Sequence, residues 1–259
     1  LVDDFALPVP SMVICELLGV PYADRDEFQG RATRQIDLSL PLEERGRVAA
    51  ESRAYMGELV DRAWSAPGDD MLGMLIREHG DDLSRAELIG IASLLLIAGH
   101  ETTANMLGLG TLALLRAPDQ LAHVRDEPGA VAPAIEELLR YLTVVQIAFP
   151  RFATEDMTPG GVQISKGDGL RVSLSGADRD PRLVSDPERF DPRRPPTPHL
   201  AFGHGIHHCL GAPLARIQLQ ETIAGLARAV TRIEPDGPSR RHPSLMFPSL
   251  ATLPVRAGS

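Results

Sequence analysis

Apolar side chains recur at helical spacing over the first 80 residues, in stretches separated by proline and glycine. One stretch runs up to Gly19, a second lies between Pro41 and Pro67, and a third covers residues 71–78. Such spacing places the side chains on one helix face, and proline and glycine end helices. The pattern predicts three helices with buried faces. Cys15, on the first face, is predicted to be a small core residue.

A much longer helix is predicted to begin at Ser84. The Ser84 side chain can cap the first turn while Glu87, three residues on, completes a capping box. No proline follows until Pro118, which allows about 33 residues, or roughly 50 Å at the α-helical rise. The middle of this apolar helix holds the polar cluster 98–103. Because buried polar groups are costly without partners, this cluster is a candidate for function.

The pattern changes after a further helix predicted over residues 130–142. Apolar and polar residues alternate over 162–174 around the turn 166–169, which indicates a small antiparallel hairpin. Residues 178–198 are rich in Pro, Asp and Arg without periodicity, which predicts a long loop that is pinned or functional. A last helix follows Cys209. Its predicted buried face consists of Leu214, Ile217, Ile223, Leu226 and Val230.

The predicted elements indicate a mostly helical protein with a small β portion. The 259 residues carry 26 basic and 35 acidic side chains, for a net charge of −9, and 43% are hydrophobic. These values are ordinary for a globular protein, and the length could fill one large domain or two smaller ones. The acidic balance without a basic run argues against a nucleic-acid partner.

Membrane insertion is not predicted for this sequence. The longest apolar stretch, 88–99, has about half of the roughly 20 residues that a membrane helix needs. We therefore expect no membrane segment in this chain, and a cytoplasmic location. The sequence begins at Leu1 with text that is typical of the middle of a packed helix, which predicts a fragment of a longer protein.

The richest candidate chemistry lies around Cys209, on a glycine-rich loop directly before a helix. Unpaired backbone N–H groups and the helix dipole favour a thiolate there. Gly203, Gly205 and Gly211 would let a flat, bulky cofactor approach the backbone. One thiolate without a second cysteine nearby fits the axial ligand of a haem iron better than zinc or an iron–sulfur cluster.

The spacing of Phe202, Gly205, Cys209 and Gly211 resembles the haem-binding loop of the cytochrome P-450 family. Three further segments resemble family motifs in the same order along the chain. They are Ala98-Gly99-x-Glu101-Thr102, Glu137-Leu138-Leu139-Arg140 and Pro187-Glu188-Arg189-Phe190. The resemblance implies that residues 1–259 form a single domain, the C-terminal part of the cytochrome P-450 fold. This part contains the long central helix and the cysteine loop but not the N-terminal helices.

Glu137 and Arg140 are three residues apart and therefore share a helix face. They can form charge-assisted hydrogen bonds with each other and with Arg189. The resemblance implies that this network pins the Pro-rich loop beneath the haem. A surface ion pair is the alternative for an isolated Glu-x-x-Arg.

Thr102 can hydrogen-bond back to the carbonyl of Ala98, and Gly99 leaves room beside it for dioxygen. Glu101 adds an ionisable group that can relay protons. A mid-helix threonine satisfied only by its own backbone is the alternative. The resemblance further implies that His207 and Arg151 contact the haem propionates.

The function implied by the resemblance is that of a bacterial, soluble haem-thiolate monooxygenase. Such an enzyme activates dioxygen at haem b and inserts one oxygen atom into a small organic substrate, with electrons from a ferredoxin and a ferredoxin reductase. A basic patch of Arg193, Arg194, His204 and Arg216 is predicted to steer the ferredoxin.

Two alternatives remain open. One is a peroxide-driven haem-thiolate peroxygenase, against which the Glu101-Thr102 pair argues. The other is a non-enzymatic haem or metal sensor, in which His204, His207 and His208 join Cys209 and ligate zinc. His199 is expected to end the loop rather than to bind anything.

Overall fold

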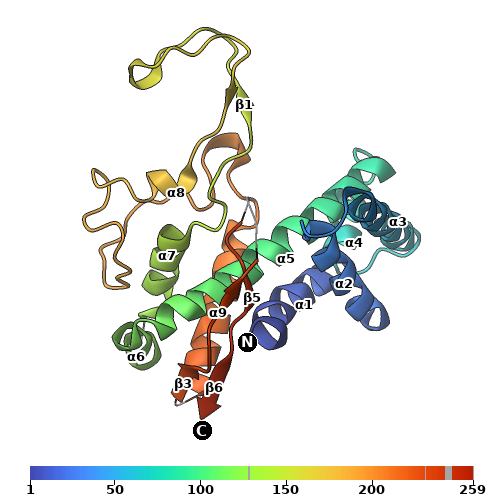
Figure 1. Cartoon of the computed structure of the whole chain (residues 1–259). Coiled ribbons are helices and arrows are strands. Elements are labelled where there is room, and N and C mark those ends of the chain that lie inside the picture. The colour runs from blue at the N-terminus through green and yellow to red at the C-terminus, as the bar shows by residue number, and fades with distance from the viewer. Residues whose placement is uncertain (128, 231, 243–246, 259) are drawn as a thin grey trace. The chain divides into compact units, whose positions relative to one another are not determined.

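The computed structural model describes residues 1–127, 129–230, 232–242 and 247–258, most of which are helical (Figure 1). The mostly helical fold class predicted from the sequence is confirmed. The chain divides into two compact units, which are described separately. Unit 1 contains Leu1–Gly108, Pro235–Ser244 and Ser249–Val255. Unit 2 contains Leu109–Glu234, Leu245–Pro248 and Arg256–Ser259.

Unit 1 is built from helices that follow closely along the chain. They are η1 Val2–Ala6, α1 Pro8–Leu17, η2 Tyr22–Asp24, α2 Arg25–Ile36, α3 Leu42–Ser65, α4 Met71–His79 and the greater part of α5 Arg85–Leu115. Strand β4 (Arg240–Arg241) pairs antiparallel with β5 (Leu250–Thr252). The core gathers apolar side chains from α1 to α5, among them Val60, Leu72 and Leu88. The three helices predicted before Ser84 are confirmed as α1, α3 and α4.

Helix α2 is not revealed by the spacing of apolar residues, because its sequence is mostly polar. Phe28 and Ala32, four residues apart, are its buried apolar residues among those whose side chains the structure describes. The helix packs along α3, where the rings of Phe28 and Tyr55 meet edge to face with centroids 6.0 Å apart. Tertiary packing therefore stabilises a helix whose apolar pattern, with only these buried positions, is too short to predict it.

The long helix α5 confirms the predicted capping box. The backbone N–H of Ser84 donates to Glu87 Oε2 at 2.8 Å, and the Ser84 hydroxyl donates to the same oxygen at 2.6 Å. In return, the Glu87 N–H donates to Ser84 Oγ at 3.3 Å. The helix then continues for 31 residues to Leu115.

In unit 2, helices α7 and α9 pack against each other, and the loops of the unit connect to them. Its elements are the end of α5, α6 Pro118–Asp126, α7 Val131–Leu142, β1 Arg151–Phe152, η3 Pro159–Gly161, β2 Gly169–Leu170, α8 Leu174–Ala177, η4 Gly205–His207 and α9 Ala212–Ala229. Helix α7 packs against α6, α8 and α9. Strand β3 (Arg232–Pro235) pairs with β6 (Val255–Gly258). The predicted helix 130–142 is confirmed as α7, and residues 178–198 lie in a long irregular loop, as predicted.

The hairpin predicted over 162–174 has different partners from those expected. Strand β2 pairs antiparallel with β1, in the register Arg151 to Leu170, and Ile164 bridges to Met157. Both arms therefore pair with upstream residues rather than with each other. The physical reason is the turn itself, whose Lys166 and Gly167 N–H groups donate to Asp156 and Ala153.

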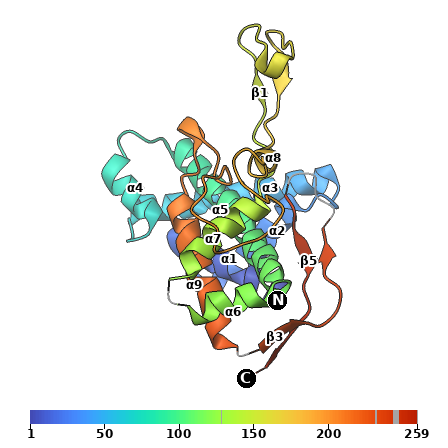
Figure 2. The same ribbon diagram turned by 90° about the vertical axis from the view of Figure 1, so that its left-hand side faces the viewer.

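This paired segment projects away from α7, α8 and α9 in both views (Figure 1, Figure 2). Large apolar side chains lie exposed along it, namely Phe149, Phe152, Val162 and Val172.

The last helix, α9, buries the predicted face only in part. Ile223 is buried, as predicted, but Ile217 is 59% exposed. Gln218, Leu219, Ala224 and Ala227 are buried as well. Alanines line part of the buried side, and a search for large apolar residues passes over them.

Within the described ranges, no helix combines the length and the apolar character that crossing a bilayer requires.

Candidate active site

Cys209 lies at the end of a tight glycine-containing loop in unit 2. Gly203 and Gly205 have φ of +73° and +82°, a backbone region that side-chain-bearing residues rarely adopt. The loop closes when the Cys209 N–H donates to the carbonyl of Phe202 at 2.9 Å. Helix α9 begins three residues after Cys209, at Ala212. The thiol is exposed to solvent.

The surroundings of Cys209 suit a flat, apolar group. Ile206 is 97% exposed and Leu210 is 88% exposed, although large apolar side chains are normally covered. A Cβ added at Gly205 would meet nothing within 4 Å, so the backbone there is open to a ligand. One sulfur donor between exposed apolar side chains fits a haem with an axial thiolate.

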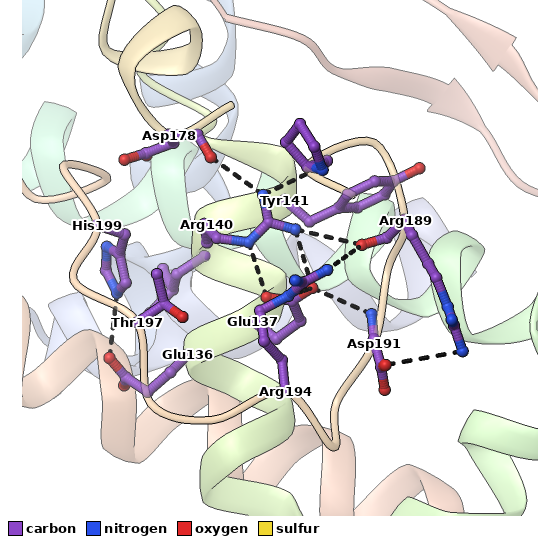
Figure 3. Close-up of polar contacts among 12 residues, drawn as sticks. Glu136, Glu137, Arg140, Tyr141, Asp178, Arg189, Asp191, Arg194, Thr197 and His199 are labelled. Atoms are coloured by element: carbon purple, nitrogen blue, oxygen red, sulfur yellow. Dashed lines mark hydrogen bonds and ion pairs between the residues drawn. The ribbon is translucent and has the colours of Figure 1, made fainter. Parts of the chain in front are cut away.

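The predicted Glu137–Arg140 pair lies in a buried network (Figure 3). Arg140 Nε donates to Glu137 Oε2 at 2.7 Å, and its terminal nitrogen donates to Oε1 at 2.8 Å. The remaining N–H groups of Arg140 reach loop carbonyls, those of Asp178 and Pro187 at 3.0 Å and that of Arg189 at 3.3 Å. Both charged side chains are at least 95% buried, so the surface-pair alternative is wrong.

The contribution of Arg189 differs from the expectation. Its carbonyl takes part in the network, but its side chain is 65% exposed and lies 3.7 Å from Asp191 (Figure 3). The second guanidinium at Glu137 belongs to Arg194, with Nε 3.3 Å from Oε1. The loop turns at Asp186, with φ of 47°, and the Arg189 N–H donates to the carbonyl of Asp186. Within this turn the Arg189 carbonyl accepts from Arg140, and the side chain pairs outside the network.

Asp178 connects this network to the cysteine loop and was not among the predicted residues. It is fully buried. Its Oδ1 accepts the backbone N–H of Leu200 at 2.6 Å, and its Oδ2 accepts the hydroxyl of Thr143 at 2.9 Å. Leu200 precedes Phe202 by two residues. The sequence signal available was an aspartate that directly follows an apolar segment at the start of the long loop.

A second carboxylate, Glu136, faces α9 and the loop rather than Arg140. Arg216 donates to both of its oxygens, at 2.7 Å from Nε and 3.0 Å from the terminal nitrogen. His199 Nε2 lies 3.1 Å from Glu136 Oε2. The hydrogen bond from His199, together with those from Arg216, lowers the pKa of Glu136 to about 2. His199 thus makes a structural contact within the protein where the long loop ends.

The predicted basic patch does not form as expected. Arg194 is 90% buried against Glu137, and Arg216 is neutralised by Glu136. Arg193 is exposed and donates to Gln120 Oε1 at 2.7 Å. Two of the four cations are thus paired with carboxylates, Arg194 with the buried Glu137 and Arg216 with the partly exposed Glu136. Arg193 and His204 are exposed.

In unit 1, the polar cluster of α5 makes local contacts. The Thr102 hydroxyl donates to the carbonyl of Ala98 at 2.6 Å, as predicted. Asn105 Nδ2 donates to Glu101 Oε1 at 2.9 Å. Burial raises the pKa of Glu101, partly offset by this hydrogen bond. The acid therefore holds its proton to a higher pH than an exposed glutamate.

Gly99 serves a different purpose from the expected one. A Cβ at this position would lie 2.4 Å from Ile14 Cδ1 of α1. The missing side chain lets Ile14 pack directly on α5, so the space at Gly99 is filled by Ile14.

His100 lies between these residues, inside the predicted polar cluster 98–103, which assigned it no role of its own. It is 2% exposed, and its Nε2 has no hydrogen-bond partner among the described residues. Burial lowers the pKa of His100 to about 4, so the ring is neutral near pH 7. The available signal was a histidine inside an apolar helix.

Comparison with known proteins gives the family. The sequence profile described as Cytochrome P450 matches residues 66–229, more than half of the chain. The chain belongs to the cytochrome P450 family. Members of this family use haem b and dioxygen.

Bacterial cytochromes P450 are among the proteins whose sequences are similar to this chain. Cytochrome P450 FAS1 of Rhodococcoides fascians is 49% identical over 228 residues, which cover 88% of this chain and 57% of that protein. Pentalenic acid synthase of Streptomyces avermitilis is 45% identical, covering 87% of this chain and 56% of that protein. The chain thus spans little more than half the length of these relatives.

Solved cytochrome P450 structures share the fold. Cytochrome P450 MoxA from Nonomuraea recticatena has a TM-score of 0.90 and 43% identity, over 100% of this chain and 65% of that one. CYP105P1 in complex with filipin I has a TM-score of 0.93 and 41% identity, over 99% of this chain and 66% of that one.

The other residues proposed for a cytochrome P450 site are exposed. Arg151 is in β1 and donates to the carbonyls of Phe149 and Pro150, and His207 ends η4. Their contact with haem propionates stays a prediction. Among the residues that the structure describes, no three His, Cys, Asp or Glu side chains are grouped as metal ligands, so the zinc alternative gains no support.

Proposed function

We propose that the protein is a haem-thiolate monooxygenase in which Cys209 is the axial ligand of haem b. The observation that carries the proposal is the exposed Cys209 thiol between the exposed Ile206 and Leu210, in a chain of the cytochrome P450 family. When bound, the haem supplies oxygen activation, with insertion of one oxygen atom into a small organic substrate. A ferredoxin and its reductase supply the electrons.

The residues around Cys209 hold the loop and the cofactor. Gly203, Gly205 and Gly211 keep the backbone clear, and Phe202 closes the loop through its carbonyl. His207 donates one N–H to a propionate, whereas Arg151 offers a permanent charge and two parallel donors. A cytoplasmic location accompanies this function.

The Glu137–Arg140 network supports the loop rather than the chemistry. Arg140 satisfies three carbonyls of the loop that leads to Cys209, those of Asp178, Pro187 and Arg189. Since each carbonyl gains a charged donor, the loop is fixed before the cofactor binds.

Thr102 and Glu101 are assigned to proton transfer in this proposal. The Thr102 hydroxyl donates to Ala98 at rest, which leaves its oxygen free to accept a hydrogen bond. Glu101 is a half-buried acid whose pKa is raised by burial, so it can give up and regain a proton at a higher pH than an exposed glutamate. This acid–hydroxyl pair favours the oxygen-dependent reaction over the peroxide-driven alternative.

The test uses the complete protein and two cysteine positions. In Cys209→His and Cys209→Ala, the thiolate-type Soret band of the reduced, carbon-monoxide-bound protein is expected to disappear. Cys15→Ala, which removes a buried sulfur of the unit 1 core, is the control and should keep the band. A thiolate-type band that persists in the Cys209 variants overturns the proposal.

A further inference from the structure

The ring of Phe202 is held by a charged side chain from α9. The guanidinium carbon of Arg216 lies 4.6 Å from the ring centroid, which is a cation–π contact. The rings of His199 and His208 lie 6.0 Å and 6.3 Å from Phe202 on tilted planes. Phe202 is therefore surrounded by three nitrogen-bearing side chains.

Glu136 fixes the position of Arg216. Two parallel N–H bonds from one guanidinium to one carboxylate define the plane of the group as well as its place. The cation on Phe202 therefore cannot swing away without breaking both bonds. Glu136 lies on α7 and Arg216 on α9, so the pair also ties the two helices together.

His199 completes the arrangement as a neutral ring. Its Nδ1 accepts the backbone N–H of Ala201 at 3.2 Å and so carries no proton. Its Nε2–H then donates to Glu136 Oε2 at 3.1 Å. The ring is 94% buried, and the cluster of Glu136, His199 and Arg216 has no net charge.

The cluster is coupled to Cys209 in two ways. The carbonyl of Phe202 accepts the Cys209 N–H, so a shift of Phe202 moves the residue that carries the sulfur. The hydrogen bonds from Arg216 to Glu136 raise the pKa of Arg216, and the negative charge of Cys209 adds to this effect. Arg216 lies on Phe202, and the carbonyl of Phe202 accepts the Cys209 N–H, so the guanidinium charge is placed beside the loop that carries the sulfur.

We propose that Glu136, His199 and Arg216 are positioning residues that set both the place and the electrostatic surroundings of the Cys209 sulfur. Glu136 and His199 hold Arg216 on Phe202, and Phe202 holds the loop. The proposal rests on the proposed function, because it takes Cys209 as the iron ligand. In this arrangement Arg216 is engaged by Glu136 and Phe202 and does not serve to attract a redox partner.

The first measurement is the reduction potential of the haem in the complete protein. Arg216→Gln removes a positive charge and should lower the potential, whereas Glu136→Gln removes a negative charge and should raise it. Each change is expected to alter the equilibrium between oxidised and reduced haem by about three- to tenfold, where tenfold corresponds to about 59 mV for one electron. A merely structural role does not produce shifts of opposite sign.

Conservative and matched variants sharpen this test. His199→Gln keeps a donor to Glu136 and an acceptor for Ala201, so its potential should match that of the wild type. Arg31→Gln is the matched control, because Arg31 also lies over a ring, 4.5 Å from the Tyr55 centroid, and donates to a glutamate, Glu27, at 2.8 Å, in unit 1. Shifts of one sign only, or equal shifts in Arg31→Gln, overturn the proposal.

The second measurement needs no haem. In folded, haem-free complete protein, Arg216→Gln and Glu136→Gln should each change the alkylation rate of Cys209 by about three- to tenfold. The buried Cys15 serves as the internal reference. An unchanged rate together with unchanged potentials overturns the inference while the thiolate band keeps the proposed function intact. Persistence of that band in Cys209→Ala overturns both.

Discussion

The carboxylate of Asp178 accepts the backbone N–H of Leu200 at 2.6 Å, across 22 residues of irregular loop. Its other oxygen accepts the Thr143 hydroxyl at the end of α7, and its carbonyl accepts Arg140. One buried residue therefore joins the Arg140 network to the segment that leads into the cysteine loop. The Arg140 network and the cysteine loop, which are separate motifs in the sequence, are therefore connected through Asp178.

Asp178→Ala tests this connection. It removes both carboxylate oxygens, so the backbone N–H of Leu200 loses its partner. We expect unfolding to become easier by about 1–3 kcal/mol, measured by urea denaturation. Asp180→Ala, at an exposed pair with Arg182, is the control and should change stability by less than about 0.5 kcal/mol. Equal effects of the two substitutions would contradict the connection.

Arg194 and Arg189 can be distinguished in the same assay. Arg194→Ala leaves the buried Glu137 with one fewer cation and strips donors from three carbonyls, those of Ser185, Asp186 and Arg189. We expect a loss of about 2–4 kcal/mol. Arg189→Ala removes an exposed side chain and should cost less than about 0.5 kcal/mol. The reverse order would restore the arrangement expected from the sequence motif.

Two glycines of α5 offer a matched pair. Gly99→Ala places a Cβ against Ile14 and is expected to destabilise the protein by about 1–3 kcal/mol. At Gly90 a Cβ meets nothing within 4 Å, so Gly90→Ala should stabilise the helix by up to about 1 kcal/mol. Adding Ile14→Val to Gly99→Ala should recover part of the loss. Denaturation midpoints of all four proteins check this, and equal effects at both glycines would rule it out.

His100 predicts a dependence of stability on pH. Its pKa is about 4 in the folded chain against 6.5 for an ordinary histidine, so the unfolded chain binds more protons between these values. Stability is therefore complete above about pH 6.5 and is lost as the pH falls toward 4, by about 3 kcal/mol in total. His100→Met should flatten this part of the profile of unfolding free energy. His79→Gln, at an exposed position, should leave it unchanged.

Thr102 and Glu101 are tested by electron accounting in the complete enzyme. Thr102→Ala should leave oxygen consumption largely intact while product falls and hydrogen peroxide rises, because the hydroxyl is lost. Glu101→Gln keeps the contact shape but cannot cycle a proton, so turnover should fall by about 10²-fold or more. Ser93→Ala, which removes another hydroxyl bonded back to its helix, is the control. Unchanged coupling in both variants would make this polar cluster structural.

Local features of this fold follow directly from the sequence. The Ser84–Glu87 capping box and the Thr102–Ala98 hydrogen bond each involve residues within one helical turn, so their spacing alone predicts the contact. The buried pair of Glu137 and Arg140 belongs to the same class. The family assignment rested on similar short spacings around Cys209 and is confirmed.

Contacts made across long loops do not follow in this way. Arg194 and Glu137 are 57 positions apart, and the turn at Asp186 decides which arginine of the loop faces inward. Gly99 shows the same limit, because its partner Ile14 belongs to another helix. Such contacts depend on the path of the backbone in three dimensions, and residue spacing carries no record of that path.

The projecting segment that carries β1 and β2 has a practical consequence for handling this polypeptide. Its strands β1 and β2 are only two residues long each, so they offer little open edge to another chain. Phe152 and Val162 nevertheless place exposed apolar surface on the segment. Exposed apolar patches favour association between molecules. Any self-association through this segment is therefore expected to depend on those side chains, and a charged substitution at Phe152 is expected to weaken it.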